Sequence, residues 1–255
     1  MIEAVKVQGL WKSYHQRPQI GIKELLVRRK VARSSRFARE WALQDITLTI
    51  EKGRAFGVVG HNGTGKSTLL GLLLGTMVPD RGTIQVNGRI ASLLEIGAGF
   101  HPELTGRENI FLYGSILGMS LRELRQRLDK IIEFSELVDA IDNPIRTYSN
   151  GMITRLGFSV IAHAPAAILL IDEVLAVGDA RFQQKCIQKM MQFKRDQGTI
   201  VFVSHDLESL RDICDDGVCL NEGSVAKLGG INEVIQHYQQ ITSVQADTVP
   251  ILERL

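Results

Sequence analysis

Several features that would decide a protein's class at once are scarce in this chain of 255 residues. No apolar run approaches the roughly 20 residues needed to span a bilayer, and the longest compact one, Ala166–Ile171, ends at Asp172. The N-terminal stretch MIEAVKVQGL lacks the basic segment and apolar core of a signal peptide. These absences favour a protein that lies in the cytosol or faces it.

The chain also has few cysteines and a small net charge. Three cysteines (Cys186, Cys214 and Cys219) form no CxxC pair, so we expect buried reduced thiols, with a metal shared by Cys214 and Cys219 as the alternative. A net charge of +2 is too small to indicate a nucleic-acid-binding protein, and we expect no nucleic acid as a partner. The chain is long enough for one large α/β domain or two small ones.

What is present is an alternation of strand and helix patterns. We expect strands over Val5–Leu10, Ile46–Ile50, Arg54–Val59, Thr83–Val86, Ile90–Leu93, Ala167–Ile171, Thr199–Val203 and Gly217–Asn221. We expect helices over Lys66–Leu74, Thr105–Met119, Leu121–Phe134, Ala180–Arg195, Asp206–Ile213 and Ile231–Gln240, with no clear pattern after Thr242. The alternation in the second half predicts an α/β fold with a mainly parallel sheet and helices on both faces.

The strongest local signal is GHNGTGKST, which fits the phosphate-binding pattern GxxxxGK[ST] between an expected strand and an expected helix. Backbone N–H groups of such a loop surround a β-phosphate, and glycines permit the backbone to come close. The lysine reaches the β- and γ-phosphates, and the following serine offers its hydroxyl to Mg²⁺. A glycine-rich turn without a ligand is the alternative. We therefore expect ATP to contact Gly60, His61, Asn62, Gly63, Thr64, Gly65, Lys66, Ser67 and Thr68.

Two later strands end in polar residues. Asp172 and Glu173 follow one of them, and His205 follows the other. Ligands bind at the carboxyl ends of strands in such sheets. We expect Asp172 to hold Mg²⁺ through water, Glu173 to act as the general base on the attacking water, and His205 to bond the γ-phosphate and orient Glu173 or the water. A purely structural histidine is the alternative for His205.

This order of motifs resembles that of the ATP-binding cassette (ABC) family over essentially the whole chain. The resemblance implies a P-loop NTPase core, an N-terminal antiparallel β subdomain and a helical subdomain at about residues 100–165. These parts would form one ATPase domain at residues 1–245, with a short tail at 246–255. It also implies that Tyr14 stacks on adenine, a half-buried surface tyrosine being the alternative.

The family carries a Ser-Gly motif, usually LSGGQ, before its acidic strand, and the matching stretch here is YSNGM at Tyr148–Met152. Only Ser149 and Gly151 match the usual form. The resemblance implies that both contact ATP held by a second copy in a homodimer, and that Asp179 faces that copy. The family's usual glutamine before the helical subdomain is missing, and Glu95 falls nearest to its place, where a carboxylate could take a Mg²⁺-bound water.

The stretch LLEIGAGFHPELTGRENI, the YSNGM variant, the AVGD loop and a basic insertion before Trp41 occur together. The combination resembles exporters of lipid-linked bacterial cell-surface polysaccharides, namely O antigen, capsule and teichoic acid. It implies a peripheral ATPase on the cytoplasmic face of the inner membrane. Its partner would be an integral-membrane subunit, in two copies, and it would act on lipid-linked polysaccharide only indirectly. The alternatives are a subunit of another ABC transporter and a soluble non-transport ABC ATPase. About 15 residues follow the last expected helix, too few for the carbohydrate-binding domain of some relatives.

The insertion, at residues 16–40, has its own pattern. Between Arg17 and Arg39 it holds eight basic residues and one acidic residue, so this stretch carries +7. Ile20, Ile22, Leu25 and Leu26 are interleaved with the charges. A cationic amphipathic segment is attracted to an anionic membrane by about 1 kcal/mol per basic residue. We expect a helix near the membrane surface and the transporter's lateral opening, with a solvated loop or a nucleic-acid contact as alternatives.

Overall fold

The computed structural model describes residues 2–15, 39–94, 96–172 and 179–248. Most of the basic insertion, Glu95, Glu173 and residues 249–255 lie outside this part of the chain. The strands are β1 Glu3–His15, β2 Arg39–Glu51, β3 Ala55–Val59, β4 Arg81–Val86, β5 Ile90–Ser92, β6 Ile168–Ile171, β7 Thr199–Val203, β8 Asp216–Asn221 and β9 Ser224–Gly230. The helices are α2 Lys66–Leu73, α3 Gly106–Ile116, α4 Leu121–Ser135, α5 Asn150–Ile161, α6 Ala180–Arg195, α7 Leu207–Ile213 and α8 Ile231–Thr248.

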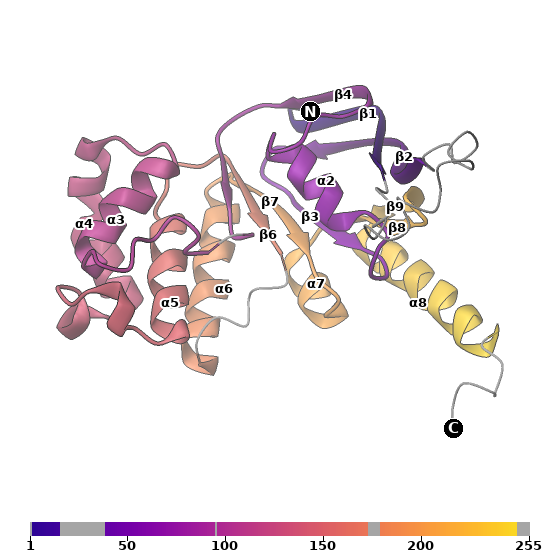
Figure 1. The fold of residues 1–255 in the computed structure, drawn as a ribbon. Coiled ribbons are helices and arrows are strands. Elements are labelled where there is room, and N and C mark those ends of the chain that lie inside the picture. Colours follow the sequence, from indigo (N-terminus) through magenta and orange to yellow (C-terminus); the bar gives the residue numbers. More distant parts are fainter. Residues whose placement is uncertain (1, 16–38, 95, 173–178, 249–255) are drawn as a thin grey trace, which may run out of the picture.

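The strands form two sheets (Figure 1). The first has the order β2-β1-β4 and is antiparallel throughout. The second has the order β5-β6-β7-β3-β8-β9 and is parallel except for the edge pair β8–β9. The expected antiparallel N-terminal sheet and the mainly parallel sheet are both confirmed.

The buried strands of the second sheet supply two cores, one on each face. Phe56 and Val58 of β3 pack with the N-terminal sheet and with α2. Ala55 and Val59, which alternate with them, pack on the other face with α3 to α8. This alternation is the period of two expected for side chains along a strand. The sheet therefore has helices on both faces, as the sequence predicts.

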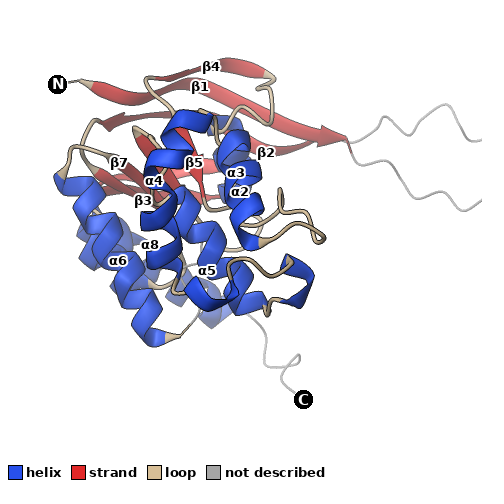
Figure 2. Cartoon of the chain, turned by 90° about the vertical axis from the view of Figure 1, so that its left-hand side faces the viewer, coloured by secondary structure: helices blue, strands red, loops and turns tan. Residues whose placement is uncertain are grey.

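The helices α3 and α4 gather at one end of the molecule, away from the N-terminal sheet (Figures 1 and 2). Each begins with a capping box, in which Thr105 pairs with Glu108 and Ser120 pairs with Glu123. These reciprocal bonds satisfy backbone N–H groups that the first turn leaves open. Local sequence therefore fixes both helix starts within one residue of the predicted positions.

Three features differ from the expected elements. The expected strands Thr83–Val86 and Ile90–Leu93 lie in different sheets, and the second of them ends at Ser92. The strand β9 was not expected, and it forms by pairing with β8. The last helix continues to Thr248, past the expected end at Gln240, with Ile241 packed against the core.

Candidate functional site

The phosphate-binding loop connects β3 to α2. β3 is buried along its whole length and delivers the chain to Gly60. A Cβ atom at Gly60 would lie 2.5 Å from the carbonyl oxygen of Leu220, and one at Gly65 would lie 2.5 Å from that of Ala42. Gly65 also has φ +97°, a left-handed conformation that side chains disfavour. The loop can take this path only because glycine occupies both positions.

Lys66 draws the loop together around its ammonium group. Its Nζ donates to the carbonyl oxygens of Gly60 at 2.7 Å and His61 at 2.9 Å. The hydroxyl of Thr64 also donates to the carbonyl of His61, at 2.8 Å. A full positive charge thus lies beside the N-terminus of α2, whose backbone N–H groups add a partial positive charge. This is an anion-binding arrangement.

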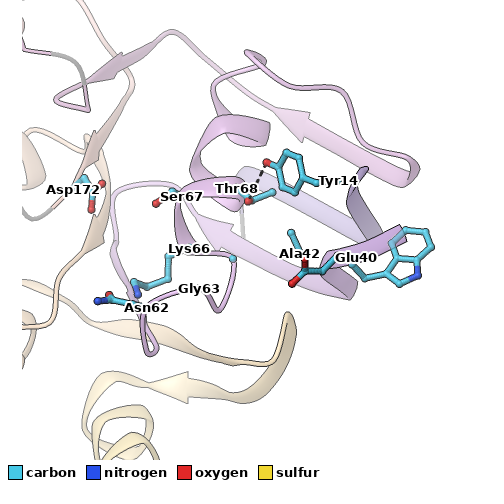
Figure 3. A pocket seen from close by; sticks show the side chains of 11 residues that line it. Tyr14, Glu40, Ala42, Asn62, Gly63, Lys66, Ser67, Thr68 and Asp172 are labelled. Carbon is cyan, nitrogen blue, oxygen red and sulfur yellow. Dashed lines mark hydrogen bonds between the residues drawn. The ribbon is translucent and has the colours of Figure 1, made fainter. Parts of the chain in front are cut away.

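A cleft of about 430 Å³ opens above the loop. It brings Tyr14, the loop and Asp172 together, although they come from three separate parts of the sequence. Figure 3 shows Asp172 opposite Ser67, and Tyr14 at the far end beside Thr68. Gly60, His61 and Thr64, also predicted to contact ATP, do not line it. The lining residues are Tyr14, Glu40, Trp41, Ala42, Asn62, Gly63, Gly65, Lys66, Ser67, Thr68 and Asp172.

Tyr14 is fixed at the end of β1 by its neighbour. The backbone N–H and the hydroxyl of Ser13 both donate to the same carboxylate oxygen of Asp80, each at 2.7 Å. The Tyr14 hydroxyl lies 3.2 Å from Oγ1 of Thr68 and donates to the sulfur of Met77 at 3.3 Å. Tyr14 remains 43% exposed, so a planar base has access to its ring.

Sequence reasoning did not single out Glu40, Trp41 and Ala42 as part of this cleft. They line it because β2 pairs with β1 in the register Tyr14↔Glu40 and Ser13↔Trp41. The only sequence signal was the strand pattern on each side of the insertion. The register between the two strands is set by tertiary pairing across that insertion and could not be read locally.

Asp172 and His205 emerge at the same edge of the parallel sheet. Asp172 follows β6, and the pair Ile171↔Phe202 aligns β6 with β7, after which His205 comes. Asp172 lines the cleft, whereas His205 is exposed and does not line it. Two other predicted site residues, Glu173 and Glu95, lie outside the described residues.

Ser149, Gly151 and Asp179 form a second group, none of which lines the cleft. Ser149 caps α5 by accepting the N–H of Met152 at 3.2 Å, and Asp179 caps α6 by accepting that of Phe182 at 2.9 Å. The exposed Asp179 carboxylate also accepts from Arg155 of α5 at 2.8 Å. The N–H of Phe182, and secondly Arg155, lower the pKa of Asp179.

Arg155 of α5, which sequence reasoning missed, contacts the ends of two other helices. Besides Asp179 it contacts Glu136, the residue that ends α4, at 3.3 Å. Glu136 also accepts from Lys185 of α6 at 3.1 Å. α5 is therefore linked to the end of α4 and the start of α6 by a network of charged side chains.

All three cysteines lie in the buried core. Cys186, Cys214 and Cys219 are buried free thiols, as predicted. Within the described ranges no group of three or more His, Cys, Asp or Glu side chains is arranged to hold a metal on its own. No described helix combines the length and apolar character required to cross a membrane.

Comparison with known proteins identifies the family. The family described as "ABC transporter" matches residues 43–176, more than half of the chain. The chain belongs to the ABC transporter family. It is therefore an ABC ATPase. The solved "Structure of ATP binding subunit of ABC transporter" superposes with a TM-score of 0.74 and 22% identity, over 92% of this chain and 93% of that one. At that identity the superposition supports the fold alone.

Curated relatives are more similar in sequence. The "O-antigen export system ATP-binding protein RfbB" of Klebsiella pneumoniae is 48% identical over 221 residues, which cover 86% of this chain and 90% of that protein. RfbB of Myxococcus xanthus is 50% identical over 80% of this chain and 46% of its own length. The "Teichoic acids export ATP-binding protein TagH" of Lactiplantibacillus plantarum is 39% identical over 80% of this chain and 56% of its own.

Proposed function

We propose that this ABC ATPase powers export of a lipid-linked cell-surface polysaccharide from the cytoplasmic face of the bacterial inner membrane. The observation that carries the proposal is the cleft that joins Tyr14, the phosphate-binding loop and Asp172 in one chain. Export of a polysaccharide is inferred from the names of the relatives, since those proteins belong to export systems for O antigen and teichoic acids.

In this proposal the residues that line the cleft and the further predicted site residues have separate tasks. The ring of Tyr14 stacks on adenine, and Lys66 neutralises the β- and γ-phosphates. Mg²⁺ fits the donor set, because the Ser67 hydroxyl and the Asp172 carboxylate line the same cleft and Mg²⁺ in such sites takes few protein oxygens beside phosphate and water. Bound there, it would neutralise phosphate charge. Glu173 orients and deprotonates the attacking water, His205 bonds the γ-phosphate, and Glu95 takes the place of the family's glutamine.

The proposal also requires a homodimer. Ser149 and Gly151 do not line the cleft of their own chain, and Ser149 is exposed at the start of α5. They would complete the cleft of a second copy, with Asp179 at the same interface. Two active sites would then form only when two chains close on two ATP molecules.

A second, mainly apolar cleft of about 540 Å³ suits an integral-membrane partner. It shares Ser67 with the nucleotide cleft, so a segment bound there would contact the residue next to the phosphates. Ile116, which lines it, is 61% exposed. We place an apolar segment of the membrane subunit in this cleft, in a complex with two copies of each subunit. The other lining residues are Gly71, Leu74, Thr76, Met77, Ser92, Leu94, Ala98, Gly99, Tyr113 and Leu117.

Steady-state turnover and nucleotide binding test the enzymatic part. Glu173→Gln should retain ATP binding, lower kcat by at least about 100-fold and trap a closed dimer, because a general base contributes about that much. Lys66→Ala should lose binding itself. Normal turnover by Glu173→Gln would exclude Glu173 as the base.

Reconstitution with the membrane subunit tests the transport part. Ile116→Glu should weaken capture of that subunit and export of the polysaccharide, while ATP binding by the isolated chain stays unchanged. Val138→Glu is the matched control, because Val138 is equally exposed, at 61%, and lies outside the apolar cleft. Equal loss of export in the two variants would argue against this docking cleft.

A further inference from the structure

His61, the second residue of the phosphate-binding loop, contacts the C-terminal helix α8. Its Nε2 lies 3.2 Å from Oγ1 of Thr242. Its ring centroid is 5.2 Å from that of Tyr238, at an interplanar angle of 46°. Tyr238 and Thr242 are four residues apart and therefore share one face of the helix. A side chain of the loop is thus held by a helix that lies at the far end of the sequence.

The direction of this hydrogen bond follows from the other bond that Thr242 makes. The hydroxyl of Thr242 donates its single hydrogen to the carbonyl oxygen of Tyr238, at 2.9 Å. Its oxygen is then left to accept, and we assign the hydrogen of the contact with His61 to Nε2, which donates it. In this assignment the bond selects one tautomer of the imidazole.

The backbone of the same residue holds the centre of the loop. The carbonyl oxygen of His61 accepts from Nζ of Lys66 at 2.9 Å and from the hydroxyl of Thr64 at 2.8 Å. On the preceding side, Gly60 lies against the carbonyl of Leu220, where even a Cβ would be only 2.5 Å away. The His61 peptide therefore links α8 on one side with the ammonium group of Lys66 on the other.

The first half of α8 is fixed to the strand that leads into this loop. Val234 and Ile235 are fully buried. Cδ1 of Ile231 lies so close to β3 that a Cβ at Gly57 would be 2.8 Å from it. The second half of the helix then reaches the loop itself through Thr242. A shift of that second half would first displace the side chain of His61.

We propose that His61 is a positioning residue through which α8 controls the phosphate-binding loop. Thr242 and Tyr238 set the His61 side chain, which sets its peptide and so the position of Lys66. Displacing the second half of α8 then lowers the affinity of the loop for ATP. This inference rests on the function proposed above, because it takes ATP as the ligand of the loop.

The test measures ATP affinity, KM and kcat of the full chain in five variants. Thr242→Val and His61→Leu should each weaken ATP binding about fivefold, the effect of one lost hydrogen bond. The double variant should be no weaker than His61→Leu alone. His61→Gln keeps a donor and should stay within about twofold of the natural chain. Ser243→Ala is the matched control, because that hydroxyl bonds carbonyls of its own helix. The change should appear in KM and leave kcat unaltered.

A spectroscopic signature separates positioning from a general loss of structure. The imidazole ¹⁵N shifts of His61, assigned by their loss in His61→Gln, should report a protonated Nε2 that Thr242→Val alters. Thr242→Val binding ATP as tightly as Ser243→Ala would overturn the inference, as would additive losses in the double variant. If the natural chain bound ATP no better than Lys66→Ala, the proposed function would fail instead, and the ¹⁵N shifts would still test the contact.

Discussion

Two helices of this protein begin at residues proposed to face phosphate, and their first turns are built differently. α2 follows Gly65 in a left-handed conformation, and its first turn makes no hydrogen bond to a capping side chain. α5 follows Ser149, whose hydroxyl already accepts the N–H of Met152 at 3.2 Å. Open backbone N–H groups attract anions. The first turn of α2 is therefore prepared for a ligand within its own chain.

The two helix starts also differ in exposure, since that of α2 lines a cleft and that of α5 lies at the surface. Thr68–Leu73 of α2 is buried, and Lys66, Ser67 and Thr68 line the nucleotide cleft. Ser149 and Asn150 are exposed, and a Cβ at Gly151 would meet only the Ser149 hydroxyl, at 3.8 Å. The comparison suggests that one chain holds most of a nucleotide site and presents the missing part of another at its surface.

The first prediction, with the largest expected effect, tests this difference by adding one methyl group at each helix start. Gly65→Ala should lower ATP affinity by about 100-fold or more, because the new Cβ would meet the Ala42 carbonyl at 2.5 Å and displace the N–H groups that bind phosphate. Gly151→Ala should leave ATP binding by the isolated chain unchanged. Titration of both variants with ATP, at equal thermal stability, checks the difference. Equal losses would mean that the two helix starts are not distinct.

Much of this site could be predicted from sequence because its parts are local. The glycines and lysine at Gly60–Lys66 define a loop whose geometry depends on a few neighbouring residues, and α6 and β7 begin and end where their patterns predict. Family resemblance, rather than spacing, pointed to Ser149, Asp179 and Tyr14. Their roles stay predictions, because a contact with a second copy or with a base leaves no mark in one chain's pattern.

The residues that sequence reasoning missed are those placed by tertiary pairing. Glu40 and Trp41 line the cleft through the register of β2 on β1. Arg155 joins α4, α5 and α6 through partners that lie 19 and 24 residues away. Neither register across an insertion nor a side-chain network has a local signature. The length of α8 was missed for the same reason, since contacts with the core extend it.

A second prediction separates the two possible tasks of Ser149. Ser149→Asp keeps a good helix cap but sets a negative charge where a γ-phosphate would approach. We expect kcat to fall by about 30-fold, from charge repulsion at the dimer interface. Ser149→Ala should cost about 1 kcal/mol of stability through the lost cap. Turnover assays with chemical unfolding measure both. Normal turnover by Ser149→Asp would remove Ser149 from the active site.

A third prediction tests the end of the nucleotide cleft at which Tyr14 is proposed to stack on adenine. Tyr14→Leu should weaken ATP binding about tenfold, since stacking of a base on an aromatic ring contributes about 1–3 kcal/mol. Tyr14→Phe keeps the ring and loses only the contacts with Thr68 and Met77, so we expect about a twofold change. Competition binding with a fluorescent nucleotide measures both. If Phe were as harmful as Leu, the hydroxyl rather than the ring would position the nucleotide.

The smallest expected effect is a loss of folding stability at low pH, which arises at His163 beside α5. His163 follows α5, its Nδ1 lies 2.7 Å from the Ser159 carbonyl, and burial lowers its pKa to about 4. Arg127, Lys130 and Lys189 add to this lowering. The unfolded chain takes up the His163 proton first, at about pH 6.5. The contribution of His163 to folding stability is therefore fully present above that pH and is lost progressively towards about pH 4.

Allowing for partial solvent screening, we expect His163 to account for about 1 kcal/mol of the stability lost between about pH 7.5 and about pH 5. His163→Asn keeps a donor for Ser159 and removes the titration, so its urea midpoint should fall less over this range. Hydrogen exchange should place the acid-induced opening in α5 and leave the first turn of α2 protected. Parallel pH slopes for the two proteins would contradict this origin. Equal opening of α2 and α5 would show that the two helix starts respond as one unit, against the difference in their construction.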